Sequence, residues 1–219
     1  MKTDLKIAHL LCTRLCHDLA GPIGAISAGV ELMGIGAEMI DDETISLLSG
    51  SAGAAFRKLK FLREAFGWSG GSSAKFDDLE RTLIEYIYAT SGLSGAPTLE
   101  WPMQEGLERV AERLGNSGPQ IVSNLALLGL ECMHSCETLS LTVTFAADAL
   151  DVVVVNRTTT ERTSKLREDT EAAISSPGGA PMTAQNVQAH LTRSLVMGTG
   201  GALAIRDDGG GAVLTAHWP

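Results

Sequence analysis

The chain has 219 residues and a formal net charge of −9, which argues against a nucleic-acid-binding protein, because such proteins carry a basic face. Hydrophobic residues make up 44% of the sequence and charged residues 20%, as is typical of a globular protein with one large domain or two small ones. No stretch reaches about 18 consecutive apolar residues, and the N-terminus lacks the apolar core and cleavage site of a signal peptide. We therefore expect a cytoplasmic protein that binds neither nucleic acid nor membrane.

The first predicted element is a long amphipathic helix over residues 3–33. Its apolar residues recur at steps of three or four, which is the period of a helix with one apolar stripe. His17 lies off this stripe, roughly 200° around the helix from both Leu15 and Leu19, and should therefore face water. Pro22 costs about 3 kcal/mol inside a helix, so it indicates either a function at this point or a simple kink.

A second amphipathic helix should follow a short connection that contains glycine. Asp41 or Asp42 is a natural N-cap, and apolar residues then recur from Ile45 to Phe66, before Gly67 ends the pattern. Two such helices joined by a short connection form an antiparallel hairpin. One hairpin leaves its apolar seam uncovered, so we expect two copies to form a dimeric four-helix bundle. The alternative is that the hairpin packs against the rest of its own chain.

Residues 67–74 are rich in glycine and serine and mark the predicted boundary between two domains, residues 1–68 and residues 74–219. The second domain should be an α+β sandwich, with helices on one face of an antiparallel sheet. Its predicted helices cover residues 76–90, 119–134 and 183–197, and its predicted strands cover residues 98–101, 139–146, 150–156, 201–206 and 212–217.

Four cysteines occur as two pairs with i, i+4 spacing, Cys12 with Cys16 and Cys132 with Cys136. Each pair has a histidine nearby, so a zinc site is one interpretation. The simpler interpretation is that reduced thiols pack within helices, because structural zinc sites more often use shorter spacings on turns.

Residues 15–26, LCHDLAGPIGAI, resemble the phosphoacceptor box of dimeric histidine kinases, in which a histidine and an acid precede a proline at this spacing. The chain as a whole is similar to the ChpT family of histidine phosphotransferases. This resemblance implies a dimeric relay protein of bacterial cell-cycle signalling that lacks kinase activity. The predicted order of helices and strands after residue 74 also resembles the ATP-binding domain of histidine kinases.

Three departures from the kinase pattern fall where a nucleotide would bind. Leu128 stands four residues after Asn124, where a Mg²⁺-binding asparagine is expected, and leucine has no oxygen with which to bind the cation. Asn156, Arg157 and Thr158 follow a valine-rich strand in place of an aspartate–glycine pair, and no glycine-rich lid precedes the last helix. We therefore expect the kinase fold without an ATP site, and no cofactor bound by this chain.

The resemblance implies reversible phosphoryl transfer between His17 and an aspartate of a response-regulator receiver domain, which would bring its own Mg²⁺. The receiver of a hybrid histidine kinase would be the donor. An exposed imidazole is largely neutral and nucleophilic at cellular pH, and Asp18 is predicted to orient or polarise it. The alternatives are a non-catalytic dimeric adaptor that binds response regulators and a thiol-ligated zinc protein.

A docking face for the receiver is predicted around His17. The residues that follow it on the same face are small and would let a partner approach closely, although Gly21 stands where kinases often carry a polar residue. Counting back from the hairpin turn places a basic part of the second helix opposite His17, and a further basic cluster lies where the nucleotide loop is lost. The predicted partner-binding residues are Arg14, Ala20, Gly21, Gly24, Arg57, Lys58, Lys60, Arg157, Arg162, Lys165 and Arg167.

Overall fold

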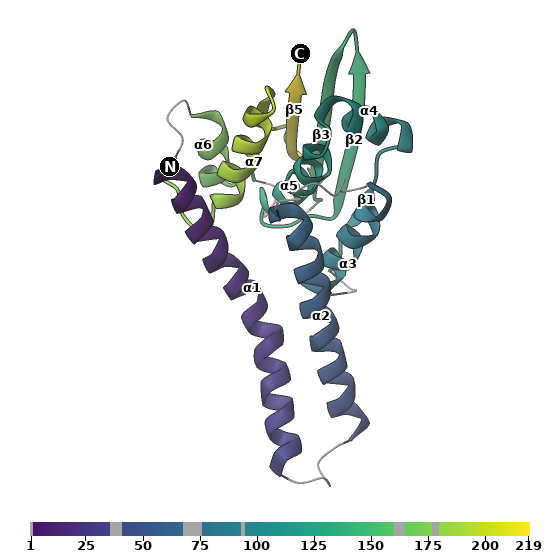
Figure 1. The fold of residues 1–219 in the computed structure, drawn as a ribbon, viewed down its shortest axis with the longest axis vertical. Helices are drawn as coiled ribbons and strands as arrows, with labels where there is room; N and C mark the ends of the chain where they lie inside the picture. Colours follow the sequence, from purple (N-terminus) through teal and green to yellow (C-terminus); the bar gives the residue numbers. More distant parts are fainter. Residues whose placement is uncertain (1, 36–40, 68–75, 93–94, 160–164, 177–179) are drawn as a thin grey trace.

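The computed structural model describes residues 2–35, 41–67, 76–92, 95–159, 165–176 and 180–219 (Figure 1). The predicted glycine–serine boundary at residues 67–74 therefore lies almost entirely outside the described residues. In chain order, the elements are α1 (Lys2–Ile35), α2 (Asp42–Phe66), the 3₁₀ turn η2 (Phe76–Asp78), α3 (Leu79–Ser91), β1 (Thr98–Glu100), α4 (Gln104–Leu114), α5 (Ser117–Glu131), β2 (Thr138–Ala146), β3 (Ala149–Arg157), α6 (Glu168–Ser175), α7 (Val187–Gly198), β4 (Ala202–Asp207) and β5 (Gly211–Trp218).

Helices α1 and α2 form the predicted hairpin, whose closed end extends well beyond the rest of the molecule (Figure 1). Asp41 caps α2, because its carboxylate accepts a hydrogen bond of 2.8 Å from the backbone N–H of Thr44. The helices approach closely at Gly29, where an added Cβ would lie only 2.5 Å from Cδ2 of Leu48. No helix among the described residues is long and apolar enough to cross a membrane.

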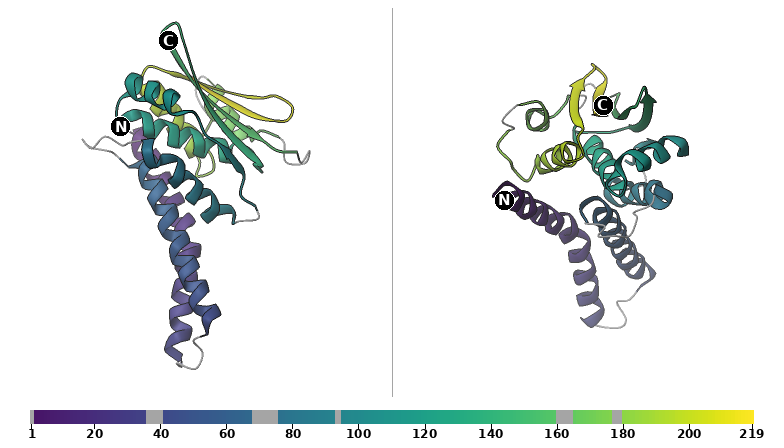
Figure 2. Two further views of the ribbon diagram at one scale, coloured as in Figure 1. Left: turned by 90° about the vertical axis from the view of Figure 1, so that its right-hand side faces the viewer. Right: turned by 45° about the horizontal axis from the view of Figure 1, so that its top comes forward.

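The rest of the chain forms a five-stranded sheet in the order β1-β2-β3-β5-β4, with helices covering one of its faces (Figure 2). The strands from β2 onward pair antiparallel, as predicted. Strand β1 instead pairs parallel with β2, so the prediction of a wholly antiparallel sheet is wrong at this edge. The chain between these strands crosses over through α4 and α5, and such a crossover returns it in the same direction.

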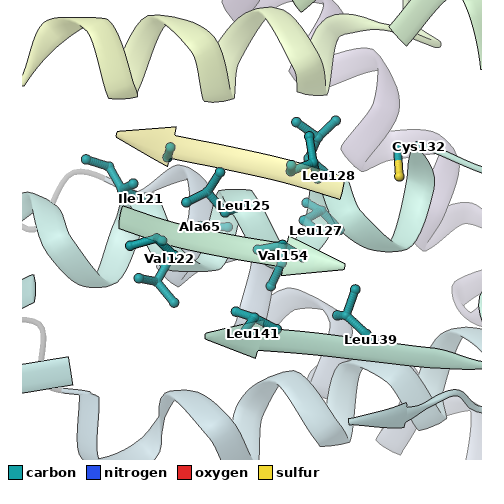
Figure 3. Packing of buried hydrophobic residues seen from close by; sticks show 14 of the residues in the cluster. Ala65, Ile121, Val122, Leu125, Leu127, Leu128, Cys132, Leu139, Leu141 and Val154 are labelled. Atoms are coloured by element: carbon teal, nitrogen blue, oxygen red, sulfur yellow. The ribbon is translucent and has the colours of Figure 1, made fainter. Parts of the chain in front are cut away.

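Helix α5 is the centre of the hydrophobic core. Every residue from Gly118 to Gly129 except Gln120 is buried, which is expected of a helix that is apolar around its whole circumference. Its side chains meet the sheet on one side and the end of α2 on another, as Figure 3 shows for Leu141 of β2 and Ala65 of α2. The predicted apolar helix over residues 119–134 is therefore confirmed, although it begins and ends two to three residues earlier.

Two short helices were not predicted from the sequence. In α4 only Leu107 and Val110 are buried, and α6 has eight residues with three acids in its first turn. Helix α6 is too short to show an apolar period, whereas Leu107, Val110 and Leu114 give α4 the three-and-four spacing of an amphipathic helix, so α4 could have been predicted. The last helix begins at Val187 instead of residue 183, because Asn186 accepts a hydrogen bond from the backbone N–H of Thr183 at 2.8 Å and so closes a turn before the helix.

Asn124 joins three helices within the core. Its Nδ2 donates to the carbonyl oxygens of Ala65 in α2, at 2.6 Å, and of Gln120, at 2.8 Å. Its Oδ1 accepts a hydrogen bond of 2.9 Å from Nε2 of Gln188 in α7. Asn124, in the middle of α5, therefore has a structural role, because it fixes the hairpin to the sandwich.

We predict that Asn124→Ala lowers the free energy of unfolding by about 2–3 kcal/mol, because it leaves buried polar partners unpaired. The matched control is Asn116→Ala, since Asn116 is exposed and its side chain does not cap α5. The control should change stability by less than about 0.5 kcal/mol. Chemical denaturation measures both variants, and equal losses would contradict this role for Asn124.

Candidate functional site

His17 lies near the midpoint of α1, and its side chain is 86% exposed, which confirms the predicted orientation toward water. Its Nδ1 lies 3.3 Å from Oδ1 of Asp18. An ionised carboxylate can only accept a hydrogen bond, so this contact requires a proton on Nδ1. The lone pair of Nε2 is then available for reaction, and Asp18 stands where the sequence predicted an orienting acid.

A pocket of about 680 Å³ lies beside His17 and draws its walls from segments far apart in the sequence. Helix α1 contributes four residues from two successive turns. The others come from α2, α3, α5, the short segment just beyond α5, and the segments before α6 and α7. The lining residues are Thr13, Arg14, His17, Asp18, Lys58, Tyr86, Thr90, Leu130, Glu131, Met133, Arg167, Ala184 and Gln185.

An ion pair joins α1 to α5 inside this pocket. Nη2 of Arg14 donates to Oε1 of Glu131, and Nε of Arg14 lies 3.6 Å from Oδ2 of Asp18. The two paired side chains are mostly buried, with 14% of Arg14 and 27% of Glu131 exposed. Burial raises the pKa of the Glu131 carboxyl group, and the Arg14 guanidinium opposes that rise. Arg14 thus has a partner within its own chain, and its predicted contact with another protein stays a prediction.

Glu131 was missed by sequence reasoning, although one signal could have found it. It is the single charged residue of α5, a helix that is otherwise buried in the core. A carboxylate at the end of such a helix must reach solvent or a counter-charge, because burying an unpaired charge is costly. The sequence offers no means of choosing which of its basic residues supplies that counter-charge.

Besides Arg14, two more of the predicted basic residues reach the pocket, Lys58 from α2 and Arg167 from the segment before α6. The backbone N–H of Arg167 donates to the carbonyl oxygen of Cys132 at 2.9 Å, which holds this segment against the end of α5. Its guanidinium also contacts Asp169, with Nε 3.4 Å from Oδ1. Cations beside the exposed imidazole favour the approach of an anionic group.

Two other basic residues of α2 do not line the pocket. Lys60 is directed toward α3, where its Nζ lies 3.8 Å from Oε2 of Glu85. The guanidinium of Arg57 lies beside Gly53 in the preceding turn. Their contact with a partner stays a prediction.

Of the predicted basic cluster after β3, only a part lies beside His17. Arg157 pairs with Asp208, and neither it nor the exposed Lys165 lines the pocket. Arg162 lies outside the described residues. Within the described part of this cluster, Arg167 alone adjoins His17.

The small residues that follow His17 are exposed on α1, as predicted. A Cβ added at Gly21 or Gly24 would meet no described atom within 4 Å, so this part of the helix is open to a partner. Ala20 is also exposed. Their role as a docking face is not decided by the exposure and stays a prediction.

The two cysteine pairs, which were weighed as a zinc site, lie in different surroundings. Cys12 and Cys16 are exposed on α1, whereas Cys132 is buried. Burial raises the pKa of Cys132 and of Cys136 to about 12 each, so both are thiols in the metal-free protein at neutral pH. In the part of the chain that the structure describes, no three His, Cys, Asp or Glu side chains come together as metal ligands.

The positions that depart from the kinase pattern serve the core. Leu128 is almost completely buried between α5 and the sheet. Asn156 is also buried, and its Nδ2 donates to the carbonyl oxygen of Gly129 at 2.8 Å. Neither side chain is placed to bind a nucleotide from solvent.

Comparison with known proteins supports the resemblance suggested by residues 15–26. No protein-family model matches the chain. Over 85 residues the chain is 38% identical to the protein phosphotransferase ChpT of Brucella abortus (strain 2308), a match that covers 38% of this chain and 40% of that protein. The matched region therefore spans well under half the length of this relative. These findings confirm the similarity to the ChpT family at the level of sequence.

Solved structures confirm the fold. A bacterial phosphotransferase structure superposes with a TM-score of 0.73 at 24% identity, covering 97% of this chain and 96% of the other. The histidine kinase ThkA, in its complex with the response regulator TrrA, superposes with a TM-score of 0.53 at 16% identity, covering 100% of this chain and 63% of the other. The predicted architecture, a helical hairpin followed by a kinase-like α+β sandwich, is thus confirmed.

Proposed function

We propose that this chain, similar in sequence and fold to the ChpT family, is a histidine phosphotransferase of a phosphorelay. It would carry phosphoryl groups between aspartates of response-regulator receiver domains, with His17 as the phosphorylated residue and the receiver of a hybrid histidine kinase as donor. The observation that supports this most is the exposed imidazole, contacted at Nδ1 by Asp18 and bordered by Lys58 and Arg167. The likeness to a named protein phosphotransferase supports the same class of reaction.

In the proposed reaction, the Nε2 lone pair of His17 attacks the phosphorus atom of an aspartyl phosphate. The N–P bond forms as the P–O bond to the aspartate breaks, and the electron pair of that bond leaves with the receiver's carboxylate. Positive charge develops on the imidazole ring, and Asp18 stabilises it by accepting the hydrogen bond from Nδ1–H. The reverse steps deliver the phosphoryl group to a second receiver.

Charge neutralisation dominates such transfers, because the phosphoryl group passes through a loose transition state. In this chain, Lys58 and Arg167 are the candidates for contacts with the phosphoryl oxygens or with an acidic receiver pocket. We propose that the Mg²⁺ ion is held by the receiver and that this chain binds no cofactor. The strip of small residues Ala20, Gly21 and Gly24 would then let the receiver bring that ion close to His17.

The hairpin supports the proposal of a homodimer, because its own chain leaves an apolar face uncovered. On each helix most of the exposed large apolar residues lie within about 60° of one another around the axis and form one face, whereas Leu32 and Leu47 lie on the opposite side of their helices. That face lies roughly 120° around α1 from His17, so a second copy bound there would leave the histidine accessible. The residues are Leu5, Ile23 and Val30 on α1 and Ile45, Phe56 and Leu59 on α2, each at least 48% exposed.

The central prediction concerns His17→Ala. The donor is a receiver domain that a hybrid histidine kinase has phosphorylated with radiolabelled ATP. Wild-type protein mixed with this receiver should acquire acid-labile label, and His17→Ala should acquire none. Because His17 packs against little of the protein, the variant should unfold at the wild-type temperature. The matched control is His9→Ala, since His9 is exposed on the same helix and should be dispensable.

Label on His17→Ala at the normal rate would show that the site is assigned wrongly. Wild-type protein that binds the receiver yet never acquires label would favour the non-catalytic adaptor. Zinc bound stoichiometrically in the purified protein would favour the thiol-ligated metal protein.

The homodimer predicts that Leu59→Glu, in the exposed apolar face, gives monomers, because a buried unpaired charge costs several kcal/mol at an interface. Met103→Glu is the matched control, since Met103 is 79% exposed but lies just before α4, away from the hairpin. Sedimentation at micromolar concentration distinguishes the two variants. A wild-type protein that sediments as a monomer would refute the dimer.

We further predict that Mg-ATP does not bind and does not label the chain. Leu128 cannot bind the cation, and transfer from ATP depends on Mg²⁺ to neutralise the β- and γ-phosphates. Calorimetry with Mg-ATP should show no heat of binding in a preparation that accepts label from the phosphorylated receiver. A micromolar dissociation constant, or label on His17 from ATP alone, would identify a kinase instead.

A further inference from the structure

A continuous line of charged contacts runs from the sandwich to the proposed phosphoacceptor. It begins at Glu131 at the end of α5, passes through Arg14 to Asp18, and ends at Nδ1 of His17. We propose that Glu131 is a positioning residue for His17 and acts through Arg14 and Asp18. The inference deepens the proposed function and rests on it, because it assigns to the second domain a part in presenting Nε2 to the receiver.

Glu131, where this line of contacts begins, is held in place by the fold around it. Glu131 is the last residue of α5, whose preceding turns are buried in the core, and Cys132 beyond it is buried as well. The backbone N–H of Cys132 donates to the carbonyl oxygen of Leu128 at 2.8 Å, so the helix end is hydrogen-bonded. A carboxylate fixed in this way can hold a partner side chain in one place.

Arg14 is suited to transmit that position along α1. It precedes Asp18 by four residues and so lies on the same face of the helix, one turn away. A guanidinium presents several N–H groups in a planar fork, which lets Nη2 bind Glu131 while Nε faces Asp18 at 3.6 Å. A lysine at this position would offer a single charged atom and could not hold both carboxylates in the same geometry.

The burial of the pair makes the contact difficult to break. Arg14 and Glu131 are each mostly removed from solvent, so separating α1 from α5 would strand two charges in a poorly solvated pocket. Asp18, Arg167 and the buried Tyr86 are the other titratable or charged groups around the pair, and only Asp18 and Arg167 carry charge at neutral pH. The sandwich is therefore held against α1 at the turn that carries His17.

The carboxylate of Asp18 contacts both Arg14 and His17. Asp18 contacts Arg14 through Oδ2 and His17 through Oδ1, so Arg14 limits the rotation of the carboxylate that accepts from Nδ1–H. Without the charge on Glu131, Arg14 is free to bind Asp18 alone and to draw it away from the ring. The exposed imidazole could then exchange between its two tautomers, and Nε2 would no longer be the nitrogen that is consistently unprotonated.

The test uses the whole 219-residue chain with Glu131→Gln, which keeps the shape of the side chain and removes its charge. Nitrogen-15 NMR of the His17 ring should show a single Nδ1–H tautomer in the wild type and a mixture in the variant. Phosphotransfer from the labelled receiver should slow about tenfold or more, because small misplacements of a reacting group are costly, while the receiver concentration for half-maximal rate stays unchanged. The matched control is Glu112→Gln, since Glu112 is an exposed acid of α4 paired with Arg109 and remote from this pocket.

A charge exchange separates positioning from simple attachment of the two domains. Arg14→Glu combined with Glu131→Arg keeps an ion pair between α1 and α5 but places a carboxylate beside Asp18. If the pair only attaches the domains, the exchange should restore the rate and the single tautomer of His17; if our inference is right, the rate should stay low and the tautomers mixed. If the exchanged protein fails to fold, the nitrogen-15 spectrum of the His17 ring in Glu131→Gln still tests whether Glu131 positions His17.

A wild-type tautomer and rate in Glu131→Gln would overturn the inference. The ring spectrum is recorded on the free protein, so it remains informative even if no label reaches the wild type. Failure of the wild type to accept label would instead refute the proposed function, and the two failures are thereby distinguishable.

Discussion

The arrangement of the molecule depends on the burial of one end of α2. Phe61, Leu62 and Ala65 are completely or almost completely buried against the sandwich, and the ring of Phe61 lies 4.7 Å from that of Tyr86 between centroids. Earlier in the same helix, Phe56 is 67% exposed. The C-terminal end of α2 thus fixes the hairpin to the α+β sandwich. The rest of α2 projects away from the sandwich (Figure 1).

This attachment determines what surrounds His17. The histidine lies where α1 passes the sandwich, so that α2, α3 and α5 all contribute to its pocket. The imidazole itself remains exposed, while the side chains of Arg14 and Glu131 beside it are mostly buried. Such a division suits a side chain that must meet a large partner directly, because its own chain can hold its orientation from beneath without covering it.

The α+β sandwich has a kinase-like fold in which positions expected to bind a nucleotide pack in the core. Asn124 joins the hairpin to the sandwich, and Leu128 packs in the core. In place of the nucleotide loop, the chain carries Arg167 to the pocket beside His17. Conversion of ligand-binding positions into packing positions explains how the fold persists without the ATP site that we propose it lacks.

The features that depend on residues close together in the sequence could be predicted from the sequence. The apolar period predicted both long helices, Asp41 predicted the start of the second, and the position of His17 relative to the stripe predicted its exposure. The predicted strands over residues 139–146 and 150–156 agree with β2 and β3 to within one residue, and between them Ala147 and Asp148 adopt the positive φ values of 48° and 72° that a two-residue hairpin requires. Each of these features is set by residues within a few positions of one another.

Tertiary structure alone decided which distant residues meet. Arg14 and Glu131 are separated by 117 positions, and no periodicity or motif relates them. The same holds for the parallel pairing of β1 and for the selection of Lys58 and Arg167, and not their basic neighbours, to line the pocket. The sequence by itself pointed to His17 as the proposed phosphoacceptor and predicted its exposure, whereas the contacts around it arise only when α5 is buried and brings its terminal carboxylate to α1.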